Sequence, residues 1–357
     1  LNGSGNTLNN VVVGNAGDNN LYGLDGNDLL QGGIGSDILD GGSGDDFLIG
    51  GAGQDLLLGG PGADEADFGI ELRRSYSFNA STVTLTPIQG YLGDSASSVE
   101  SLAFFDGTLV VDAGSDAAQV FRIYKAALGR VPDSMGLSNW TAAHEFGGLT
   151  LVDVAAGFVG SAEFVLRYGG LTNEQFVSLL YQNVLGRGPD PAGAQHWVSQ
   201  LQAGVSRAEI LIGFSESQEH VQITLPAITA GLWIQDLNAG AVARLYDTAF
   251  DRLPDAGGLI NWTSAIESGM ALVSIANQFV TSAEFSLRYG TLSNAEFVQL
   301  LYVNVLNREA DQAGAANWTN ALNNGMSRAD VVLQFSESPE HIILQAPYID
   351  HGIWFGG

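Results

Sequence analysis

The stretch GGIGSDILD, GGSGDDFLI, GGAGQDLLL and GGPGADEAD, residues 32–67, repeats a nine-residue unit without a gap. Two looser copies precede it, GLDGNDLLQ (23–31) and GNAGDNNLY (14–22). The eighth position of the unit is apolar: Leu21, Leu30, Leu39, Leu48, Leu57 and Ala66. The sixth position is polar: Asn19, Asp28, Asp37, Asp46, Asp55 and Asp64. A fixed period of this kind predicts a solenoid in which successive units stack.

The composition of the unit predicts a parallel β-roll. Glycine at the first, second and fourth positions allows positive φ, so that the chain can turn without a Cβ clash. The last three residues form a short strand whose apolar side chain at position eight points inward. Because one strand cannot bury that face alone, the turns must stack on one another.

Stacking brings the acidic side chains close together. If two units form one coil, then Asp28, Asp46 and Asp64 line one edge of the roll, whereas Asn19, Asp37 and Asp55 line the other. Neighbouring carboxylates would lie about 4.8 Å apart and repel each other. A hard divalent cation between successive loops removes this repulsion, and Ca²⁺, which takes about six to eight oxygen ligands, suits the position. The alternative, a calcium-free Gly/Asp-rich linker, gives no reason for an apolar residue at every ninth position.

The unit GGxGxDxUx resembles the RTX nonapeptide repeat of proteins that bacteria export by type I secretion, and the resemblance covers residues 14–67. It implies that calcium lies between the loops, bound by position-six side chains and turn carbonyls. The implied side-chain ligands are Asn19, Asp28, Asp37, Asp46, Asp55 and Asp64, and the implied carbonyls include those of Gly23, Gly32, Gly41, Gly50 and Gly59. Because Asn10 and Asn19 replace aspartate, we expect the first coil to bind weakly. The carboxylate pairs 28/46, 37/55 and 46/64 predict about three good sites, and about three to five ions in all.

The overall composition excludes several classes of partner. The chain has 357 residues, a formal net charge of −26 and no cysteine. Such a charge makes nucleic acid and anionic membrane unfavourable partners. No apolar run approaches the length of a membrane-spanning helix, so membrane insertion is not expected. The chain begins LNGSGN, with neither Met nor a signal peptide, and we expect it to be part of something longer that is exported without a cleaved signal.

Residues 69–117 are predicted to be β-rich. The runs Thr82–Thr86 and Val99–Val111 contain many branched and aromatic residues, and Asp106–Gly107 suits a hairpin turn. An open roll leaves the last coil with unpaired edges, which need a cover. We therefore interpret this segment as a cap of the roll.

From Ala117 onward, apolar residues take helical spacing, and a second repeat begins. The pattern Y-x5-R-x2-D-x2-G-x3-W occurs four times, starting at Tyr124, Tyr181, Tyr246 and Tyr302. The first and third copies are 122 residues apart (246 − 124), so the larger unit is a pair of copies. The predicted fold class is therefore multidomain, an N-terminal parallel β-roll with a β cap followed by an all-α tandem-repeat region. The expected domains are the calcium-binding roll (1–68), the cap (69–117) and two helical domains (118–238 and 240–357).

Each copy of the pattern predicts a helix–turn–helix corner. The residue before the arginine is Gly129, Gly186, Asp251 or Asn307, types that tolerate the left-handed conformation at a helix C-terminus. The aspartate, Asp133 in the first copy, is placed to cap the next helix. Capping boxes are predicted at Thr172, Ser206 and Ser293. This half resembles the helical domain of unknown function that often follows RTX repeats in secreted bacterial proteins, through its Leu-Gly-Arg-x-Pro-Asp core at 128–133 and 185–190. The resemblance implies extracellular or cell-surface location but no mechanism.

No catalytic motif is present, and we expect no enzymatic activity from this chain. HExxH, GxSxG and GxxxxGK are all absent, and the five histidines never fall four residues apart. The Arg–Asp pairs occur four times, whereas a catalytic site is normally made once, so we interpret them as structural. His220 and His341 occupy matched positions and are expected to be helix-end residues, not ligands.

Three functions remain open. The first is a secreted or cell-surface structural or adhesive protein, in which calcium folds the roll and the helical domains mediate assembly with copies of the chain or attachment. The second is a module that binds extracellular polysaccharide or matrix. The third is the C-terminal export and folding portion of a larger secreted hydrolase. The sequence does not identify the partner of the helical domains or the oligomeric state.

Overall fold

The structure, a computed structural model, describes residues 2–88, 92–290 and 292–353. By its internal contacts the chain divides into two compact units, which we describe separately. One unit contains the chain up to Gly69, Ser75–Phe104 and Thr108–Ile234. The other contains Ile70–Arg74, Phe105–Gly107 and the chain from Gln235 onward.

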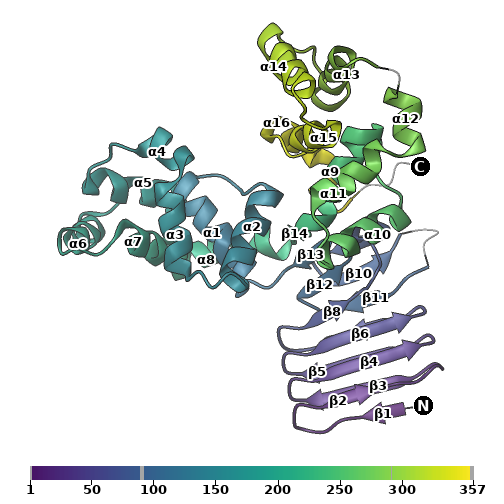
Figure 1. The fold of residues 1–357 in the computed structure, drawn as a ribbon. Helices are drawn as coiled ribbons and strands as arrows, with labels where there is room; N and C mark the ends of the chain where they lie inside the picture. Colours follow the sequence, from purple (N-terminus) through teal and green to yellow (C-terminus); the bar gives the residue numbers. More distant parts are fainter. Residues whose placement is uncertain (1, 89–91, 291, 354–357) are drawn as a thin grey trace. The chain divides into compact units, whose positions relative to one another are not determined.

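The first unit begins with a parallel β-roll whose strands alternate between two sheets (Figure 1). One sheet contains β1 (Asn2–Ser4), β3 (Asn20–Asp25), β5 (Ile38–Ser43) and β7 (Leu56–Leu58). The other contains β2 (Val11–Val13), β4 (Leu29–Ile34), β6 (Phe47–Ala52) and β8 (Glu65–Asp67). Paired strands are eighteen residues apart, as in the pairing of Leu21 with Leu39 and of Leu30 with Leu48. This register confirms the two-unit coil.

The interior of the roll is a column of position-eight side chains. All six predicted residues are at most 1% exposed: Leu21, Leu30, Leu39, Leu48, Leu57 and Ala66. Leu85, Ala96 and Leu102 extend this core beyond the repeats. Each coil buries only two apolar side chains, so the core that supports the acidic turns is thin.

The prediction that all three glycines of the unit take positive φ was wrong for the first position. Positive φ occurs mainly at the second and fourth positions, for example at Gly42 (φ 104°) and Gly44 (φ 127°). The first-position glycines are needed for space instead. A Cβ on Gly23 would lie 2.3 Å from the carbonyl oxygen of Gly41 and 2.4 Å from Oδ2 of Asp28.

The segment after the repeats extends both sheets. Strand β11 (Ser95–Ser97) pairs in parallel with β7, and β12 (Ser101–Phe104) pairs in parallel with β8. Strands β10 (Thr84–Pro87) and β9 (Tyr76–Asn79) complete the first sheet, and β13 (Gly107–Val110) and β14 (Leu232–Gln235) complete the second. The expected hairpin turn lies between β12 and β13. The short 3₁₀ helix η1 is Arg73–Ser75.

Eight helices follow in the first unit, and each half of the set repeats the same corner (Figure 1). They are α1 (Asp116–Leu128), α2 (Ser134–Glu145), α3 (Leu151–Gly160), α4 (Ala162–Tyr168), α5 (Asn173–Leu185), α6 (Pro191–Gln202), α7 (Arg207–Ser215) and α8 (Gln218–Thr229). Their core includes Phe121, Phe158, Phe176 and Phe214.

The second unit contains the matching eight helices. They are α9 (Leu237–Phe250), α10 (Ala256–Glu267), α11 (Leu272–Val280), α12 (Ala283–Tyr289), α13 (Asn294–Leu306), α14 (Gln312–Asn323), α15 (Arg328–Ser336) and α16 (Pro339–Ile349). Their core includes Tyr246, Phe279, Phe297 and Phe335. The predicted fold class, a roll with a β cap followed by all-α repeats, is confirmed, whereas the four domain boundaries stay a prediction.

The helix ends explain most of the helical repeat pattern. Gly129, Gly186, Asp251 and Asn307 are left-handed C-caps of α1, α5, α9 and α13. Asp133, Asp190, Asp255 and Asp311 are the N-caps of α2, α6, α10 and α14. The three capping boxes at Thr172, Ser206 and Ser293 are also present. Local cap chemistry therefore determined where these helices begin and end.

Candidate metal centre

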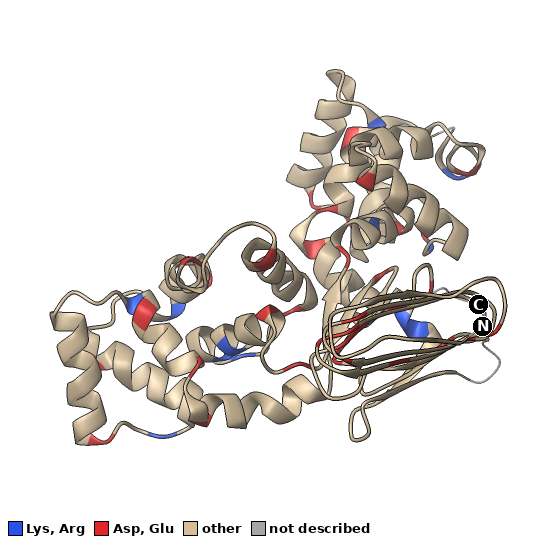
Figure 2. Ribbon diagram, turned by 90° about the horizontal axis from the view of Figure 1, so that it is seen from below, with Lys and Arg blue, Asp and Glu red and all other residues tan. Residues whose placement is uncertain are grey.

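Two ladders of polar side chains follow the edges of the roll. Each ladder residue stands immediately before a strand, so the strand register aligns it with the residue eighteen positions away. One ladder is Asn10, Asp28, Asp46 and Asp64, before β2, β4, β6 and β8, and the other is Asn19, Asp37 and Asp55, before β3, β5 and β7. Figure 2 shows acidic residues in the turns of the roll. The fold thus contains the predicted alignment of carboxylates along two edges of the roll.

One oxygen of each aspartate holds the preceding coil. The Oδ1 atom of Asp46 accepts the backbone N–H of Asp28 at 2.7 Å, and Oδ1 of Asp64 accepts that of Asp46 at 2.9 Å. On the other edge, Oδ1 of Asp55 accepts the N–H of Asp37 at 2.7 Å, and Oδ1 of Asp37 accepts that of Asn19 at 2.7 Å. These bonds fix the orientation of every carboxylate and direct its second oxygen into the turn.

The second oxygen is buried and has no hydrogen-bond partner among the described residues. This holds for Oδ2 of Asp28, Asp37, Asp46, Asp55 and Asp64, whose residues are at most 3% exposed. Leaving a buried polar atom unpaired costs about 1–3 kcal/mol, and more when it is charged. Five such atoms in one small roll indicate that a partner outside the polypeptide completes the site.

The space beside each first-position glycine is where oxygens converge. A Cβ on Gly32 would lie 2.3 Å from Oδ2 of Asp37 and 2.6 Å from the carbonyl oxygen of Gly50. At Gly23 the same two kinds of atom converge, Oδ2 of Asp28 and the carbonyl of Gly41. Only glycine leaves this space open, and it is lined by oxygen from a carboxylate of one loop and a carbonyl of the next.

Because these carboxylates are buried, their ionised form is unfavourable unless a cation lies nearby. Desolvation, together with the nearby carboxylates of Glu100 and Asp46, raises the pKa of Asp64 to about 6. Desolvation and neighbouring carboxylates also raise the pKa values of Asp46 and Asp55. A cation between the loops would relieve both causes at once.

The donor set fits Ca²⁺. Every available atom is a hard oxygen, from carboxylates and backbone carbonyls, with no thiolate or imidazole among them. Within the described residues no group of three or more His, Cys, Asp or Glu side chains is arranged to hold a metal. Sites in the roll would therefore combine one or two carboxylates with carbonyls of stacked turns, such as those of Gly41 and Gly50. The assignment of individual ligands stays a prediction.

Sequence reasoning missed two members of the ladders, Asp94 and Glu100. Asp94 stands before β11, and its Oδ1 accepts the N–H of Asp55 at 2.8 Å. Glu100 stands before β12, and its Oε2 accepts the N–H of Asp64 at 3.1 Å. The available signal was an acid followed two residues later by an inward apolar side chain, here Ala96 and Leu102, as in the repeats.

The repeated arginines of the helical half make structural contacts, as expected, but their main partner is a glutamate and not the aspartate of the motif. Arg130 lies 3.5 Å from its own Asp133, but its closer partner is Glu163, with Nε–Oε1 at 3.0 Å and a second nitrogen–Oε2 contact at 2.9 Å. The pairs Arg187–Glu219, Arg252–Glu284 and Arg308–Glu340 repeat this contact. Each guanidinium also lies over the tyrosine of its motif, at 5.2 Å for Tyr124. Four equivalent pairs tie each helical corner to the second helix after it, namely α4, α8, α12 and α16.

The motif glycine and tryptophan are packing residues. A Cβ on Gly136 would lie 2.2 Å from the hydroxyl oxygen of Tyr124, and the other three copies have the same close approach. Trp140 packs on Phe158 with ring centroids 5.2 Å apart. The motif therefore describes a corner of the scaffold.

The two matched histidines are fully buried in the first turns of α8 and α16. Nδ1 of His220 contacts the carbonyl oxygen of Ser215 at 3.0 Å, and Nδ1 of His341 contacts that of Ser336 at 2.9 Å. Nε2 of His341 contacts Oδ2 of Asp247 at 2.9 Å. Nε2 of His220 has no partner among the described residues.

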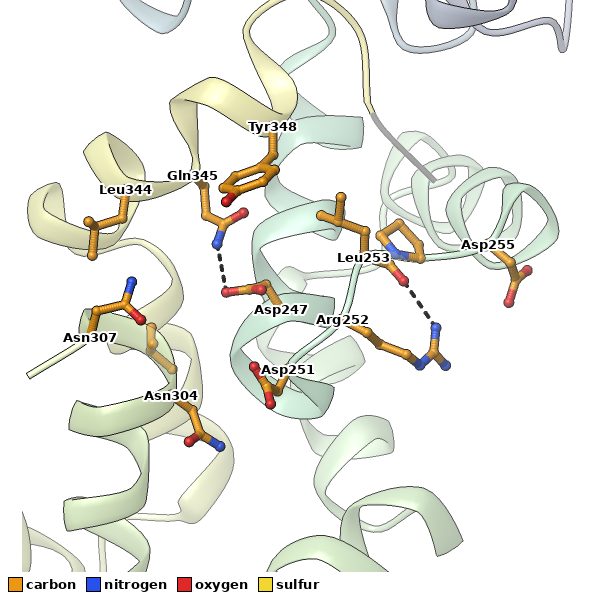
Figure 3. A pocket seen from close by; sticks show the side chains of 12 residues that line it. Asp247, Asp251, Arg252, Leu253, Asp255, Asn304, Asn307, Leu344, Gln345 and Tyr348 are labelled. Atoms are coloured by element: carbon orange, nitrogen blue, oxygen red, sulfur yellow. Dashed lines mark hydrogen bonds between the residues drawn. The ribbon is translucent and has the colours of Figure 1, made fainter. Parts of the chain in front are cut away.

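A pocket of about 560 Å³ lies between α9, α13 and α16 in the second unit (Figure 3). Asp247 is held there by Nε2 of Gln345 at 2.8 Å, in addition to His341. Tyr348, which is 52% exposed, stands at the same wall. Asp251, Asn304 and Asn307 complete a lining that is rich in carboxylate and amide groups.

Known family models match both the roll and the helical half of the chain. The family model described as the RTX calcium-binding nonapeptide repeat (4 copies) matches residues 4–39 and 31–66. The model described as domain of unknown function (DUF4214) matches residues 111–166, 155–223 and 276–344, which together are just over half of the chain. No curated protein matches the chain. No helix among the described residues is both long and apolar enough to cross a membrane.

Proposed function

Because this chain belongs to the DUF4214 family and carries RTX calcium-binding nonapeptide repeats, we propose that it is a secreted structural or adhesive protein whose roll folds when it binds calcium. Calcium binding and the absence of a catalytic motif are both in keeping with a non-catalytic role. The observation that carries the proposal is the set of five buried aspartate oxygens without a partner in the polypeptide.

The proposed folding switch has a physical basis, because the small apolar core of the roll is set against the unfavourable free energy of its buried carboxylates. Two apolar side chains per coil do not compensate for rows of buried carboxylates, so the metal-free roll is unstable. Calcium sites of extracellular modules have Kd values on the order of 10⁻⁴–10⁻³ M. At cytosolic calcium such sites are empty and the roll stays unfolded, which suits export, whereas at extracellular calcium binding and folding are one event.

The test is a calcium titration of the full chain, followed by far-ultraviolet circular dichroism and calorimetry. We expect gain of β signal at millimolar calcium, its loss on chelation, and a helical signal that changes little. An equal β signal in calcium and in chelator would reject the proposed folding switch. Magnesium at the same concentration is the control, since its smaller octahedral shell does not suit these loops.

Assembly through the helical domains is supported by two exposed leucines at matched positions. Leu166 on α4 is 88% exposed and Leu287 on α12 is 91% exposed, and they are 121 residues apart (287 − 166). The same apolar contact is therefore offered twice per chain, which permits a copy to bind two neighbours. Static light scattering at millimolar calcium tests this role. A particle mass of one chain at every concentration would contradict it.

A second candidate function, binding of a neutral or amino sugar, is favoured by the pocket in Figure 3. The aligned positions of the first helical half hold Lys125, Gly129, Thr224 and Ala227 in place of Asp247, Asp251, Gln345 and Tyr348. The first half thus forms the equivalent corner with other side chains at these four positions. Carboxylate and amide groups beside an exposed aromatic ring suit sugar hydroxyls and a sugar face.

Affinity electrophoresis through neutral polysaccharide and chitosan gels tests the second candidate. We expect retardation of the wild-type chain and its loss in Tyr348→Ala, which removes an exposed ring. The matched control is Ile223→Ala in the first half, where the side chain is also about half exposed (51%). Equal mobility of wild type and Tyr348→Ala in every gel would reject sugar binding at this pocket.

A further inference from the structure

The two ladders of polar side chains continue beyond the last nonapeptide repeat. Register places Asp94 beside Asp55, because Ser95 pairs with Leu56, and places Glu100 beside Asp64, because Ser101 pairs with Glu65. Both residues lie outside the range matched to the RTX repeat, which stops at residue 66. Two acids supplied by unrelated sequence thus occupy the positions that a further coil would fill.

These two acids make the same hydrogen bond as the repeat aspartates. Each accepts the backbone N–H of the ladder residue before it, at 2.8 Å for Asp94 and 3.1 Å for Glu100. The equivalent bonds within the repeats measure 2.6–2.9 Å. The cap therefore reproduces the orientation of a repeat carboxylate and not only its position.

At both positions the second carboxylate oxygen of the repeat aspartate and an oxygen of the cap lie close together beside a first-position glycine, as two oxygens do in the repeats. A Cβ on Gly50 would lie 2.6 Å from Oδ2 of Asp55 and 3.0 Å from Oδ2 of Asp94. A Cβ on Gly59 would lie 2.5 Å from Oδ2 of Asp64 and 2.0 Å from the carbonyl oxygen of Ser98, which stands where a repeat would have a glycine carbonyl.

An independent observation is that the repeat-side oxygens of both positions lack a partner. Asp55 and Asp64 are 3% and 1% exposed, and the Oδ2 atom of each has no hydrogen bond among the described residues. Beyond Asp64 and Glu100 the protein has a cavity of about 440 Å³, also lined by Glu65, Asp112, Asp116 and Glu145. So many carboxylates concentrate cations at this end of the roll.

We propose that the cap supplies ligands to two further calcium sites, one between Asp55 and Asp94 and one between Asp64, Glu100 and the carbonyl of Ser98. This inference rests on calcium binding by the roll as proposed above. Calcium then fastens the cap to the last coil, and these two sites can fill only when the cap is in place. Folding of the roll is thereby tied to folding of residues that the repeat itself does not contain.

Counting bound ions by native mass spectrometry tests the proposal on the full chain. We expect Asp94→Asn combined with Glu100→Gln to bind two calcium ions fewer than wild type. The matched control is Asp25→Asn, an exposed aspartate at the end of β3 and outside both ladders, which should leave the count unchanged. An unchanged count in the folded double variant would overturn the cap sites. A wild-type chain that binds no calcium would instead overturn the proposed function as a whole.

A second measurement decides the case if the double variant does not fold. The hydroxyl oxygen of Tyr76 accepts the N–H of Asp94 at 3.1 Å, so its ring stands beside the first cap site. Terbium, a calcium substitute that emits when a nearby tyrosine is excited, would report occupancy there. We expect Tyr76→Phe to reduce terbium emission while the ion count stays the same. Emission equal to that of wild type would place no ion beside Asp94 and contradict the proposal.

Discussion

Each aspartate of the roll uses its two oxygens differently. Oδ1 of Asp46 accepts a backbone N–H of the neighbouring coil, whereas Oδ2 is buried without a partner among the described residues. In the folded roll the first oxygen fixes the position of the second, which is the arrangement expected of an oriented metal ligand. The contribution of each carboxylate to stability should therefore depend on calcium.

The first prediction concerns Asp46→Asn. Asp46 belongs to two of the three carboxylate pairs of the repeats, so its replacement should weaken two sites and raise the calcium concentration at the folding midpoint several-fold. The amide can still accept the N–H of Asp28, which separates loss of metal from loss of the hydrogen bond. Circular dichroism during calcium titration measures the midpoint, with Asp25→Asn as the control. A midpoint equal to that of wild type would mean that the stacking register is not the metal register.

The second prediction concerns Gly32→Ala, which removes no oxygen. Its Cβ would lie 2.3 Å from Oδ2 of Asp37, so the methyl group should occupy the space of the ion and destabilise the calcium-bound roll by about 1–3 kcal/mol. Gly17→Ala is the control, because the nearest atom to its Cβ would be 3.6 Å away. Calorimetry in calcium should separate the two variants, and similar melting temperatures would argue against a filled space at Gly32.

The third prediction concerns pH and His220. Burial lowers the pKa of His220 below its usual value near 6.5, so the folded state binds this proton less readily than the unfolded chain. Stability linked to His220 is therefore present above about pH 6.5 and lost as the pH falls through the lowered pKa. Thermal unfolding between about pH 7.5 and 5 should show a smaller loss for His220→Gln than for wild type. Exposed His196→Gln should behave like wild type, and an equal loss in all three proteins would contradict the assignment.

At the scale of the element, local sequence determined most of what could be predicted. The nine-residue period gave the roll and its inward leucines, because a strand with one apolar position has only one face to bury. Helix ends were also readable, since Gly129 and Asn307 adopt the left-handed C-caps that their types favour. These features depend on residues within one turn of each other.

Contacts between residues far apart in the chain could not be predicted from the sequence. Glu163 is the chief partner of Arg130, yet 33 residues separate them, and the nearer Asp133 was the natural candidate. Asp94 and Glu100 were missed for the same reason, since only the pairing of β11 and β12 with the roll reveals them. The space needed at the first-position glycines likewise depends on the next coil, so positive φ was assigned to them wrongly.

The fourth prediction belongs to the helical corner. The side chain of Asp190 accepts the N–H of Gly193 at 2.9 Å and begins α6, so Asp190→Ala should cost about 1 kcal/mol. Asp190→Ser should recover most of this loss, because serine also caps helices well. Urea unfolding of the full chain in calcium measures both, and a neutral Asp190→Ala would show that α6 does not depend on its cap.

At the scale of the whole molecule, the helical repeats and the roll are stabilised in different ways. The helical repeats have large aromatic cores, with residues such as Phe176 and Phe297 fully buried. The roll has two apolar side chains per coil and, on the function proposed above, depends on calcium for the rest of its stability. Calcium should therefore control one part of the chain and leave the other folded, which a measurement with local resolution can detect.

Hydrogen–deuterium exchange of the full chain, read peptide by peptide, is that measurement. With millimolar calcium, we expect slow exchange in peptides from residues 14–67 and in those containing β11 and β12. With chelator, exchange in these peptides should become fast, while peptides from α1–α16 keep their protection. Slow exchange of residues 14–67 in chelator, equal to that in calcium, would contradict the account.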